Sequence, residues 1–146
     1  MDYENDLRLG YWLKVLTRKM TSYQDCKLSK YNITSAQLGV LIELWKKDGQ
    51  SQKEIQQILE IKPASFTGLV SYLETKGFIK RISDAEDGRI NRIFLTEEGK
   101  AIKEESFKEF LKTRDVMFKG FMKEEQQLLV CWLKKMCDNL EKGQGD

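Results

Sequence analysis

Apolar residues recur every three or four positions over much of the chain, which is the spacing of one face of an α-helix. The first such stretch runs from Leu7 to about Lys27, and we expect one long helix there. The same spacing returns from Phe107 to Phe121 and again from Leu129 to Leu140. Long helices are therefore predicted towards both ends of the chain.

Capping signals place two shorter helices after the first one. Thr34 and Gln37 have the spacing of a capping box, in which each side chain hydrogen-bonds the backbone N–H of the other residue. The helix that they open is expected to end near Lys47, where a glycine follows closely. Ser51 and Glu54 repeat the capping box and open a helix of about two to three turns.

A third short helix is predicted from Pro63 to Gly77. Proline is tolerated at the first position of a helix but breaks its interior, and glycine is favoured just after its end. The expected buried face carries four apolar residues, Phe66, Leu69, Val70 and Leu73. The residues left outward are small, polar and uncharged: Ser65, Thr67, Gly68, Ser71, Tyr72 and Thr75.

The pattern then changes to that of a β-hairpin. Phe78–Ser83 and Asn91–Leu95 are short runs rich in Ile and Phe, and the polar segment Asp84–Arg89 separates them. Thr96 is expected to cap the helix that follows. Two short helices followed directly by a hairpin form a winged helix-turn-helix, whose second helix can enter a DNA major groove. The predicted fold class is therefore mainly α with a small β-hairpin wing.

The long helices carry more large apolar side chains than a small winged lobe can cover. Mutual burial between two copies of the chain is the simplest way to cover them. We therefore expect one domain over residues 1–146, with a winged helix-turn-helix lobe at residues 33–99. Residues 1–32 and 100–146 are expected to form a helical dimerisation region.

Composition excludes several kinds of site. The chain has 146 residues, of which 40% are hydrophobic and 33% charged, as in a globular domain. It contains no histidine, which excludes Ser-His-Asp and Cys-His nucleophilic pairs and the zinc signatures that contain histidine. Its three cysteines lack the number and spacing of a disulfide framework or a zinc site. We therefore expect no metal, no cofactor and no catalytic residue, and an enzyme is the least favoured interpretation.

The beginning of the chain lacks the pattern of a secretory signal. Met1–Asp6 is acidic, whereas a signal peptide begins with positive charge. No apolar run approaches the ~20 residues that a membrane span needs. The expected location is the cytoplasm, without membrane association.

Several short motifs occur in a fixed order through the middle of the chain. They are Leu69-Val70, Leu73-Glu74 and Lys76-Gly77-Phe78-Ile79-Lys80-Arg81, then Asp84, Asp87 and Arg89, and finally Leu95-Thr96-Glu97-Glu98-Gly99-Lys100. In this order they resemble the MarR family of bacterial and archaeal transcription regulators. The resemblance covers nearly the whole chain and is densest between Ile33 and Gly99. It implies a single MarR-like domain that forms a homodimer with a helical interface and two DNA-reading lobes.

Arg89 is the strongest candidate for a DNA contact. A guanidinium at the tip of a narrow hairpin can enter a minor groove, where negative potential is concentrated. Asp87 stands two residues earlier in the Asp-x-Arg pattern of the family, and the resemblance implies that it orients that guanidinium through a bidentate ion pair. The alternative is an ordinary Asp-Gly turn with a solvated charge. Arg81 and Arg92 either contact phosphates or are surface side chains of the hairpin without a role in binding.

The helix that would read DNA carries small and polar residues placed to reach base edges or phosphates, or to let the backbone approach closely. They are Ala64, Ser65, Thr67, Gly68, Ser71 and Tyr72. Members of the family often have arginine at the positions of Gly68 and Tyr72. Strong direct readout of guanine is therefore not expected.

The predicted lobe is nearly neutral. Ser51–Leu95 contains seven Lys or Arg against six Asp or Glu, in a chain whose net charge is +2. We therefore expect modest affinity for DNA with a pronounced salt dependence. Further phosphate contacts are expected near the N-termini of two helices, from Ser51, Gln52, Lys53 and Lys62. Ser51 has the simpler alternative of acting only as a cap.

The resemblance also implies a small aromatic or lipophilic effector, bound in a crevice between the dimer helices and the winged lobe. The aromatic candidates for its lining are Tyr11, Trp12, Trp45 and Phe107. Aromatic side chains at helical spacing more often pack in a core, which is the alternative for each of them.

Cysteine offers a second possible sensor, because some relatives sense oxidants through a thiol. Such a thiol needs access and a lowered pKa, and Cys26 lies near Lys27 and Lys30 in the sequence. An inert thiol is nevertheless the favoured interpretation of Cys26. Cys131 and Cys137 lie in the apolar last helix and are expected to be core residues.

The hypothesis that follows is a homodimeric, sequence-specific transcription regulator that binds double-stranded DNA, with repression as the expected outcome. Its target would be a pseudo-palindromic duplex with half-sites ~10 bp apart, about one helical turn. The alternative is a winged-helix protein-interaction module with little affinity for DNA, which the near-neutral lobe also fits. Duplex binding that weakens steeply with added salt distinguishes the two.

Overall fold

The computed structural model describes residues 3–143, with side chains from residue 8 onward. The chain forms two compact units, Met1–Thr113 and Arg114–Asp146. In order along the first unit lie α1 (Tyr3–Leu28), a 3₁₀ turn η1 (Ser29–Tyr31), α2 (Ser35–Lys46), β1 (Gln50–Ser51), α3 (Gln52–Ile58), α4 (Pro63–Thr75), β2 (Ile79–Ser83), β3 (Asn91–Leu95) and α5 (Glu97–Ala101). The helix α6 (Lys103–Met117) runs from the first unit into the second, which also holds α7 (Lys123–Gly143).

The predicted helix starts are confirmed by their caps. The Thr34 hydroxyl accepts the Gln37 backbone N–H at 3.3 Å, and the Gln37 side-chain oxygen accepts the Thr34 N–H at 2.9 Å. Ser51 and Glu54 form the same reciprocal pair at the start of α3, at 3.2 and 2.7 Å. Pro63 opens α4 as expected. The first two starts were predictable because both partners of the cap lie within three residues. The third was predictable because proline is tolerated at the first position of a helix.

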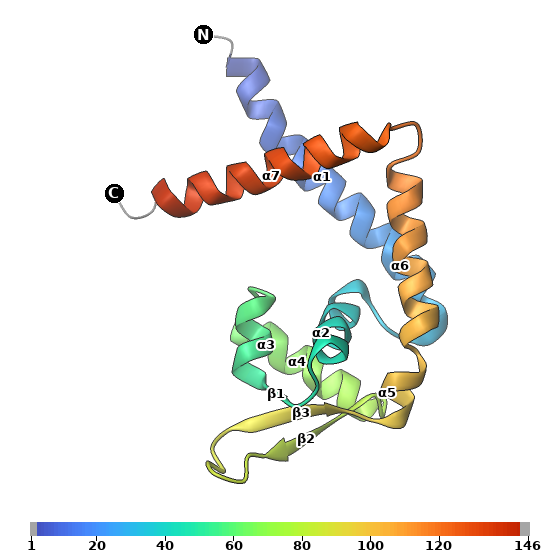
Figure 1. The fold of residues 1–146 in the computed structure, drawn as a ribbon, viewed down its shortest axis with the longest axis vertical. Helices are drawn as coiled ribbons and strands as arrows, with labels where there is room; N and C mark the ends of the chain where they lie inside the picture. Colours follow the sequence, from blue (N-terminus) through green and yellow to red (C-terminus); the bar gives the residue numbers. More distant parts are fainter. Residues whose placement is uncertain (1–2, 144–146) are drawn as a thin grey trace. The chain divides into compact units, whose positions relative to one another are not determined.

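Three helices and a small sheet make the winged lobe (Figure 1). The predicted hairpin is confirmed, with Ile79 opposite Leu95 across β2 and β3. A third strand, β1, was not predicted; it pairs antiparallel with β3 and gives the order β1-β3-β2. Two residues are too few to show an alternating pattern, so only the pairing of Gln50 with Ile93 reveals this strand.

One core holds the end of α1, the helices α2, α3 and α4, and the sheet together. Its fully buried members include Leu28, Leu41, Leu44, Ile55, Phe66, Val70, Leu73 and Ile93. Of the predicted α4 stripe, only Leu69 is half-buried. Gly99 makes the tightest approach, because a Cβ on it would lie 2.0 Å from the Phe78 carbonyl oxygen. This contact sets α5 directly against the start of the hairpin.

The helix predicted after Thr96 is confirmed at its start and divided further along. Thr96 accepts the Gly99 backbone N–H at 3.1 Å, but the helix is split into α5 and α6 around Ile102. Neither glycine nor proline marks this break, so the apolar spacing alone could not show it. In α6 the buried positions are polar, namely Ser106, Glu109 and Thr113.

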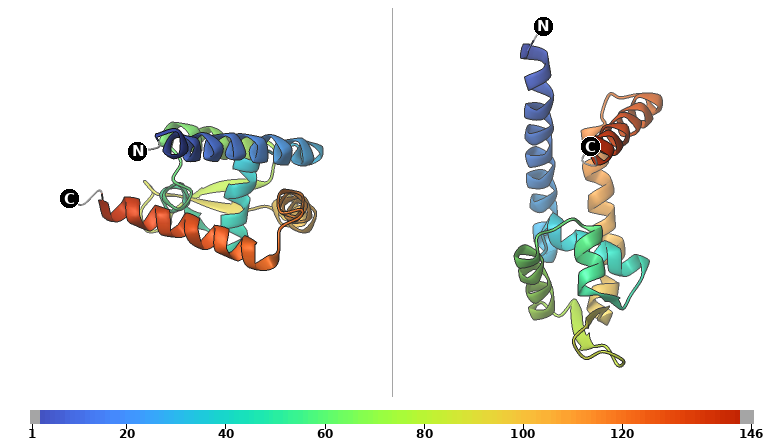
Figure 2. Two further views of the ribbon diagram at one scale, coloured as in Figure 1. Left: turned by 90° about the horizontal axis from the view of Figure 1, so that it is seen from above. Right: turned by 90° about the vertical axis from the view of Figure 1, so that its left-hand side faces the viewer.

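The long helices expose much of their apolar surface. In the right-hand view of Figure 2, α1 (blue) extends away from the winged lobe for most of its length. Its exposed large apolar residues are Leu9, Tyr11, Trp12, Leu13, Leu16, Met20 and Tyr23. In α7 no residue is buried. The expectation that Cys131 and Cys137 lie in a core is therefore wrong for the single chain, in which both are exposed.

Candidate nucleic-acid interface

The helix α4 presents the predicted small, polar face. Ala64, Ser65, Thr67 and Gly68 are exposed, whereas Phe66 on the opposite side is buried. A Cβ added to Gly68 would meet no atom within 4 Å, so this part of the helix is open. The structure therefore leaves a smooth stretch of α4 that a large, flat partner can approach closely.

Tyr72 lies further along this face and is tied to a neighbouring element. Its hydroxyl donates to the carbonyl oxygen of Asn32 at 3.3 Å, and the ammonium group of Lys76 lies 5.3 Å from its ring centroid. Ser71 beside it is half-buried. The C-terminal half of the exposed face is thus more fixed and more covered than the N-terminal half.

The tip of the wing is organised by Asp84, which was predicted only as a family-like position. One of its carboxylate oxygens accepts the backbone N–H groups of Glu86 and Asp87, at 2.8 and 3.1 Å. The other accepts a hydrogen bond from the guanidinium Nε of Arg92, and Nη1 of the same group donates to the carbonyl oxygen of Gly49 at 3.2 Å. These bonds, the Arg92 bond first, lower the pKa of Asp84 to about 2. The carboxylate thus orders the tip and joins the hairpin to the segment before β1.

Asp87 has a different partner from the one expected. Its carboxylate accepts the backbone N–H of Arg89 at 3.0 Å, and its carbonyl oxygen accepts the N–H of Ile90 at 2.9 Å. Among the side chains that the structure describes, the salt bridge of the wing joins Asp84 to Arg92 instead of Asp87 to Arg89. The predicted bidentate pair is therefore wrong for this chain on its own, because Asp87 is used to fold the turn. Arg89 is left exposed at the tip.

Arg81 and Arg92, for which two roles were open, both have partners within the lobe. Arg81 donates from Nε and Nη2 to a carboxylate oxygen of Glu74, the former at 2.9 Å, and this pair lowers the pKa of Glu74. The bond joins β2 to the last turns of α4. Both arginines thus stabilise the hairpin, and the sequence could not show this because neither carboxylate stands at a helical spacing from its partner.

A shallow hollow lies between the start of α3 and the wing. It has a volume of about 280 Å³ and is lined by Ser51, Gln52, Lys53, Arg89, Ile90 and Asn91. The structure thereby brings together two of the predicted groups, which stand almost forty residues apart in the sequence. Ile90 and Asn91 were missed, although they directly follow Arg89. Ser51 has its hydroxyl engaged as the cap of α3, and Lys62 is exposed at the start of α4.

The four aromatic candidates for an effector site have different surroundings. Tyr11 and Trp12 are exposed on α1 and contact each other edge to face, with ring centroids 5.3 Å apart. Trp45 packs against the core, and its indole N–H donates to the Gly99 carbonyl oxygen at 3.0 Å. Phe107 is exposed on α6 and stacks on Phe110. Trp45 therefore fits the alternative of a core side chain.

Cys26 is exposed near the end of α1. The residues that the structure describes contain no group of three or more Asp, Glu or Cys side chains able to hold a metal ion. None of the helices between Tyr3 and Gly143 has the length and apolar content that crossing a bilayer requires.

Comparison with known proteins identifies a matching family model, similar sequences and similar structures. The MarR family model matches residues 33–90. The HTH-type transcriptional repressor MdtR of Bacillus subtilis (strain 168) is 31% identical over 127 residues, which cover 85% of this chain and 78% of that protein. The transcriptional regulator YwaE of the same strain is 31% identical over 113 residues, 77% of this chain and 66% of its own length. The structure of the S. aureus MepR-DNA complex superposes with a TM-score of 0.78 at 28% identity, covering 90% of this chain and 95% of that one.

Proposed function

The chain belongs to the MarR family, and from this premise we propose that it is a homodimeric regulator of transcription that binds double-stranded DNA in a sequence-specific manner. The proposal rests on one observation, the hollow between α3 and the wing, which Lys53 and Arg89 both line. Ser65, Thr67 and Gly68 of α4 are exposed as well. A duplex bound here would contact a cation from α3 and another from the wing, together with the uncharged outward face of α4. The proposed role is binding, without catalysis.

In this proposal α4 enters the major groove and the wing reaches the neighbouring minor groove. The uncharged face of α4 favours contacts through Ser65 and Thr67 and through shape, with little reading of guanine. Arg89 supplies the cation at the tip of the wing, because Arg81 and Arg92 are engaged by carboxylates of the lobe. The expected affinity is therefore modest and strongly salt-dependent.

The proposed dimer is formed by the apolar faces of α1 and α7. These faces expose side chains as large as Trp12 and Trp132, more than an isolated soluble surface commonly carries. Two copies related by a two-fold axis would bind a pseudo-palindromic duplex with half-sites ~10 bp apart. We propose repression by analogy with the repressor among its relatives. We further propose that a small aromatic or lipophilic molecule releases the protein from DNA.

The experiment that tests the proposal compares the unchanged protein with Arg89→Ala. Both are titrated against a duplex that the unchanged protein selects from a randomised pool, at several salt concentrations. Loss of one phosphate or groove contact should weaken binding about tenfold and reduce the steepness of the salt dependence by about one. Glu86→Ala, a change at the same tip that removes a negative charge, is the matched control and should not weaken binding. Equal affinity of Arg89→Ala and the unchanged protein would remove Arg89 from the interface.

The same titration decides between DNA binding and the alternative of a protein-interaction module. The near-neutral lobe favours that alternative. If no duplex is selected even at low salt, or if the purified protein is a monomer by sedimentation, the proposed function is wrong.

A further inference from the structure

The side of α6 that faces the rest of its unit is polar. Ser106, Glu109 and Thr113 are its buried residues, whereas Phe107 and Phe110 are exposed and Leu111 is half-buried. Ser106 donates to the carbonyl oxygens of Ile102, directly before the helix, and Lys103, at 2.7 and 3.2 Å, and Thr113 donates to that of Glu109 at 3.1 Å. Their hydrogen bonds therefore do not hold α6 to another element. Glu109 is left as the buried residue of α6 with a bond to a different segment.

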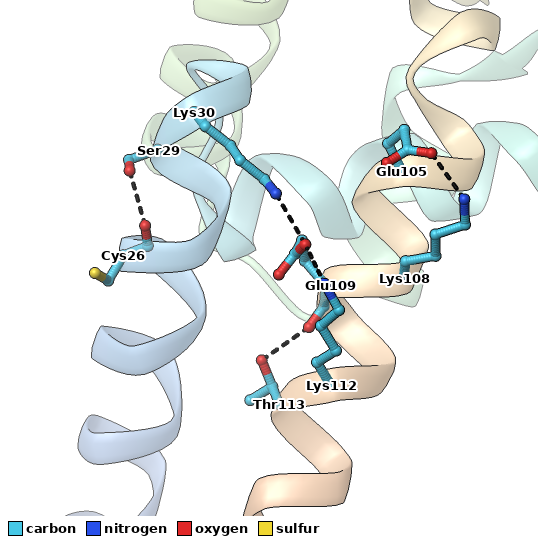
Figure 3. A network of polar contacts seen from close by, with 8 residues as sticks. All are labelled: Cys26, Ser29, Lys30, Glu105, Lys108, Glu109, Lys112 and Thr113. Carbon is cyan, nitrogen blue, oxygen red and sulfur yellow. Dashed lines mark hydrogen bonds and ion pairs between the residues drawn. The ribbon is translucent and has the colours of Figure 1, made fainter.

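Glu109 joins two segments that lie far apart in the sequence. One of its carboxylate oxygens accepts the ammonium group of Lys30, from η1, at 2.9 Å, and that of Lys112, from its own helix, also at 2.9 Å (Figure 3). The Glu109 side chain is only 5% exposed, while that of Lys30 is 55% exposed. The two lysine bonds, that of Lys112 first, lower the pKa of Glu109 to about 2. The carboxylate is therefore charged throughout the physiological range of pH.

Lys30 stands on a segment that is itself fixed to the lobe. Leu28, two residues earlier, is fully buried in the core. The Asp25 carboxylate accepts the backbone N–H of Ser35 at 2.6 Å, which ties the end of α1 to the start of α2. The ammonium group of Lys30 also lies 5.0 Å from the centroid of the Tyr31 ring. A bond from Lys30 to α6 is thus a bond from the lobe to α6.

We propose that Glu109 is a positioning residue for DNA binding: through its ion pair with Lys30 it fixes the direction in which α6 leaves the lobe, and so sets the half-site spacing that the dimer accepts. The inference rests on the proposed function. The two arms of the dimerisation region, α1 and α6, meet the lobe at this point. In the proposed dimer, a small change in the angle between α6 and the lobe moves α4 of each copy along the DNA axis. Because one ion pair holds this polar contact, loss of the pair allows the angle to change more readily than the loss of one side chain from an interdigitated apolar contact does.

The chain provides a matched pair of variants for the test. Lys30→Gln and Lys112→Gln each remove one positive charge and each leave Glu109 with one lysine partner. Only Lys30→Gln removes the tie between α6 and η1. Glu105→Gln, which breaks the exposed pair with Lys108 on the same helix, controls for the loss of a carboxylate from α6 (Figure 3). Glu109→Gln is compared with it.

The measurement is the ratio of affinities for two duplexes. One carries the half-sites that the unchanged protein selects from a randomised pool, and the other carries the same half-sites with one base pair added between them. Lys30→Gln and Glu109→Gln should each change this ratio by about three- to tenfold. Lys112→Gln and Glu105→Gln should keep it within about twofold. A loss of folded protein would lower both affinities equally and leave the ratio unchanged, so the ratio separates positioning from stability.

Two results would overturn the inference, and they differ in what they mean. If the unchanged protein binds and selects a spacing, but Lys30→Gln has the same ratio as Lys112→Gln, Glu109 serves only to stabilise the fold and the inference alone is wrong. If the unchanged protein selects no duplex, the proposed function fails and the inference fails with it.

Discussion

The winged lobe and the long helices treat their apolar residues in opposite ways. In the lobe, residues such as Phe66, Val70 and Ile93 are fully buried within one chain. On α1 and α7 the large apolar residues stay exposed, Trp132 by 55%. The core of the lobe is thus formed by a single copy, whereas each of the two helices carries exposed apolar surface that is available for assembly. The difference separates what stabilises the fold from what is available for assembly.

The largest effect is expected in the lobe core. Phe66→Ala should lower the free energy of unfolding by about 3–5 kcal/mol, because it removes a large buried side chain and leaves a cavity. Urea denaturation followed by circular dichroism measures this change. Phe107→Ala, on the exposed face of α6, is the control and should have a much smaller effect. Similar losses for both variants would mean that burial within one chain does not distinguish the two regions.

The second effect concerns assembly and compares two residues of nearly equal exposure. Trp132 on α7 and Ile58 on α3 are 55% and 54% exposed. Trp132→Ser should weaken dimerisation by about 2–4 kcal/mol, since a large aromatic side chain in an interface is a typical hot spot. Ile58→Ser should leave dimerisation unchanged. Sedimentation equilibrium measures both, and a dimer unaffected by Trp132→Ser would place the interface elsewhere.

A third comparison uses two glycines with opposite surroundings. Gly99→Ala should destabilise the protein by about 1–3 kcal/mol, because its new methyl group would overlap the Phe78 carbonyl oxygen. Gly68 lies within α4, and a Cβ at this position would meet no atom within 4 Å. Gly68→Ala should therefore stabilise the protein by up to about 1 kcal/mol. Thermal unfolding of the two variants gives the signs, and destabilisation by Gly68→Ala would show that α4 is more constrained than its surroundings indicate.

The smallest effect is the response to acid. The pKa of Asp84 is lowered to about 2 by Arg92 and two backbone N–H groups. A carboxylate with a lowered pKa in the folded state stabilises fully above its ordinary pKa, and this stabilisation is lost as the pH falls from about 4 towards about 2. Asp84→Asn should therefore reduce the loss of stability between about pH 4 and about pH 2. Glu86→Gln at the same tip is the control, and equal acid sensitivity of Asp84→Asn and the unchanged protein would contradict the role of Asp84.

The sequence predicted those features whose signals are local. The caps at Thr34 and Ser51, the start at Pro63 and the hairpin all depend on residues within a few positions of each other. What it could not predict depends on tertiary pairing. The strand β1 exists because Gln50 lies opposite Ile93, and no pattern of two residues reveals this.

The candidate site divides in the same way. Arg89, Lys53 and the outward face of α4 follow from position along helices and at a turn. The structure leaves these residues exposed apart from Ser71, which is half-buried. The partner of Asp87 was predicted wrongly, because a carboxylate in a tight turn has backbone N–H groups nearer than any guanidinium. The bond from Glu109 to Lys30 spans seventy-nine positions, so no spacing rule could propose it.

The tip of the wing has a thermodynamic consequence that reaches beyond its shape. Because the Asp84 carboxylate holds the loop through the backbone N–H groups of Glu86 and Asp87, the backbone before Arg89 is already ordered when the proposed contact with DNA forms. Little conformational entropy then remains to be lost on binding. A single cation at the tip can therefore contribute more to the lifetime of a complex with DNA than the same cation on a flexible loop. Consider two variants of equal net charge, one that removes the Asp84 carboxylate and one that removes another carboxylate of the hairpin. Their enthalpies and entropies of binding to DNA should differ even where their affinities are equal.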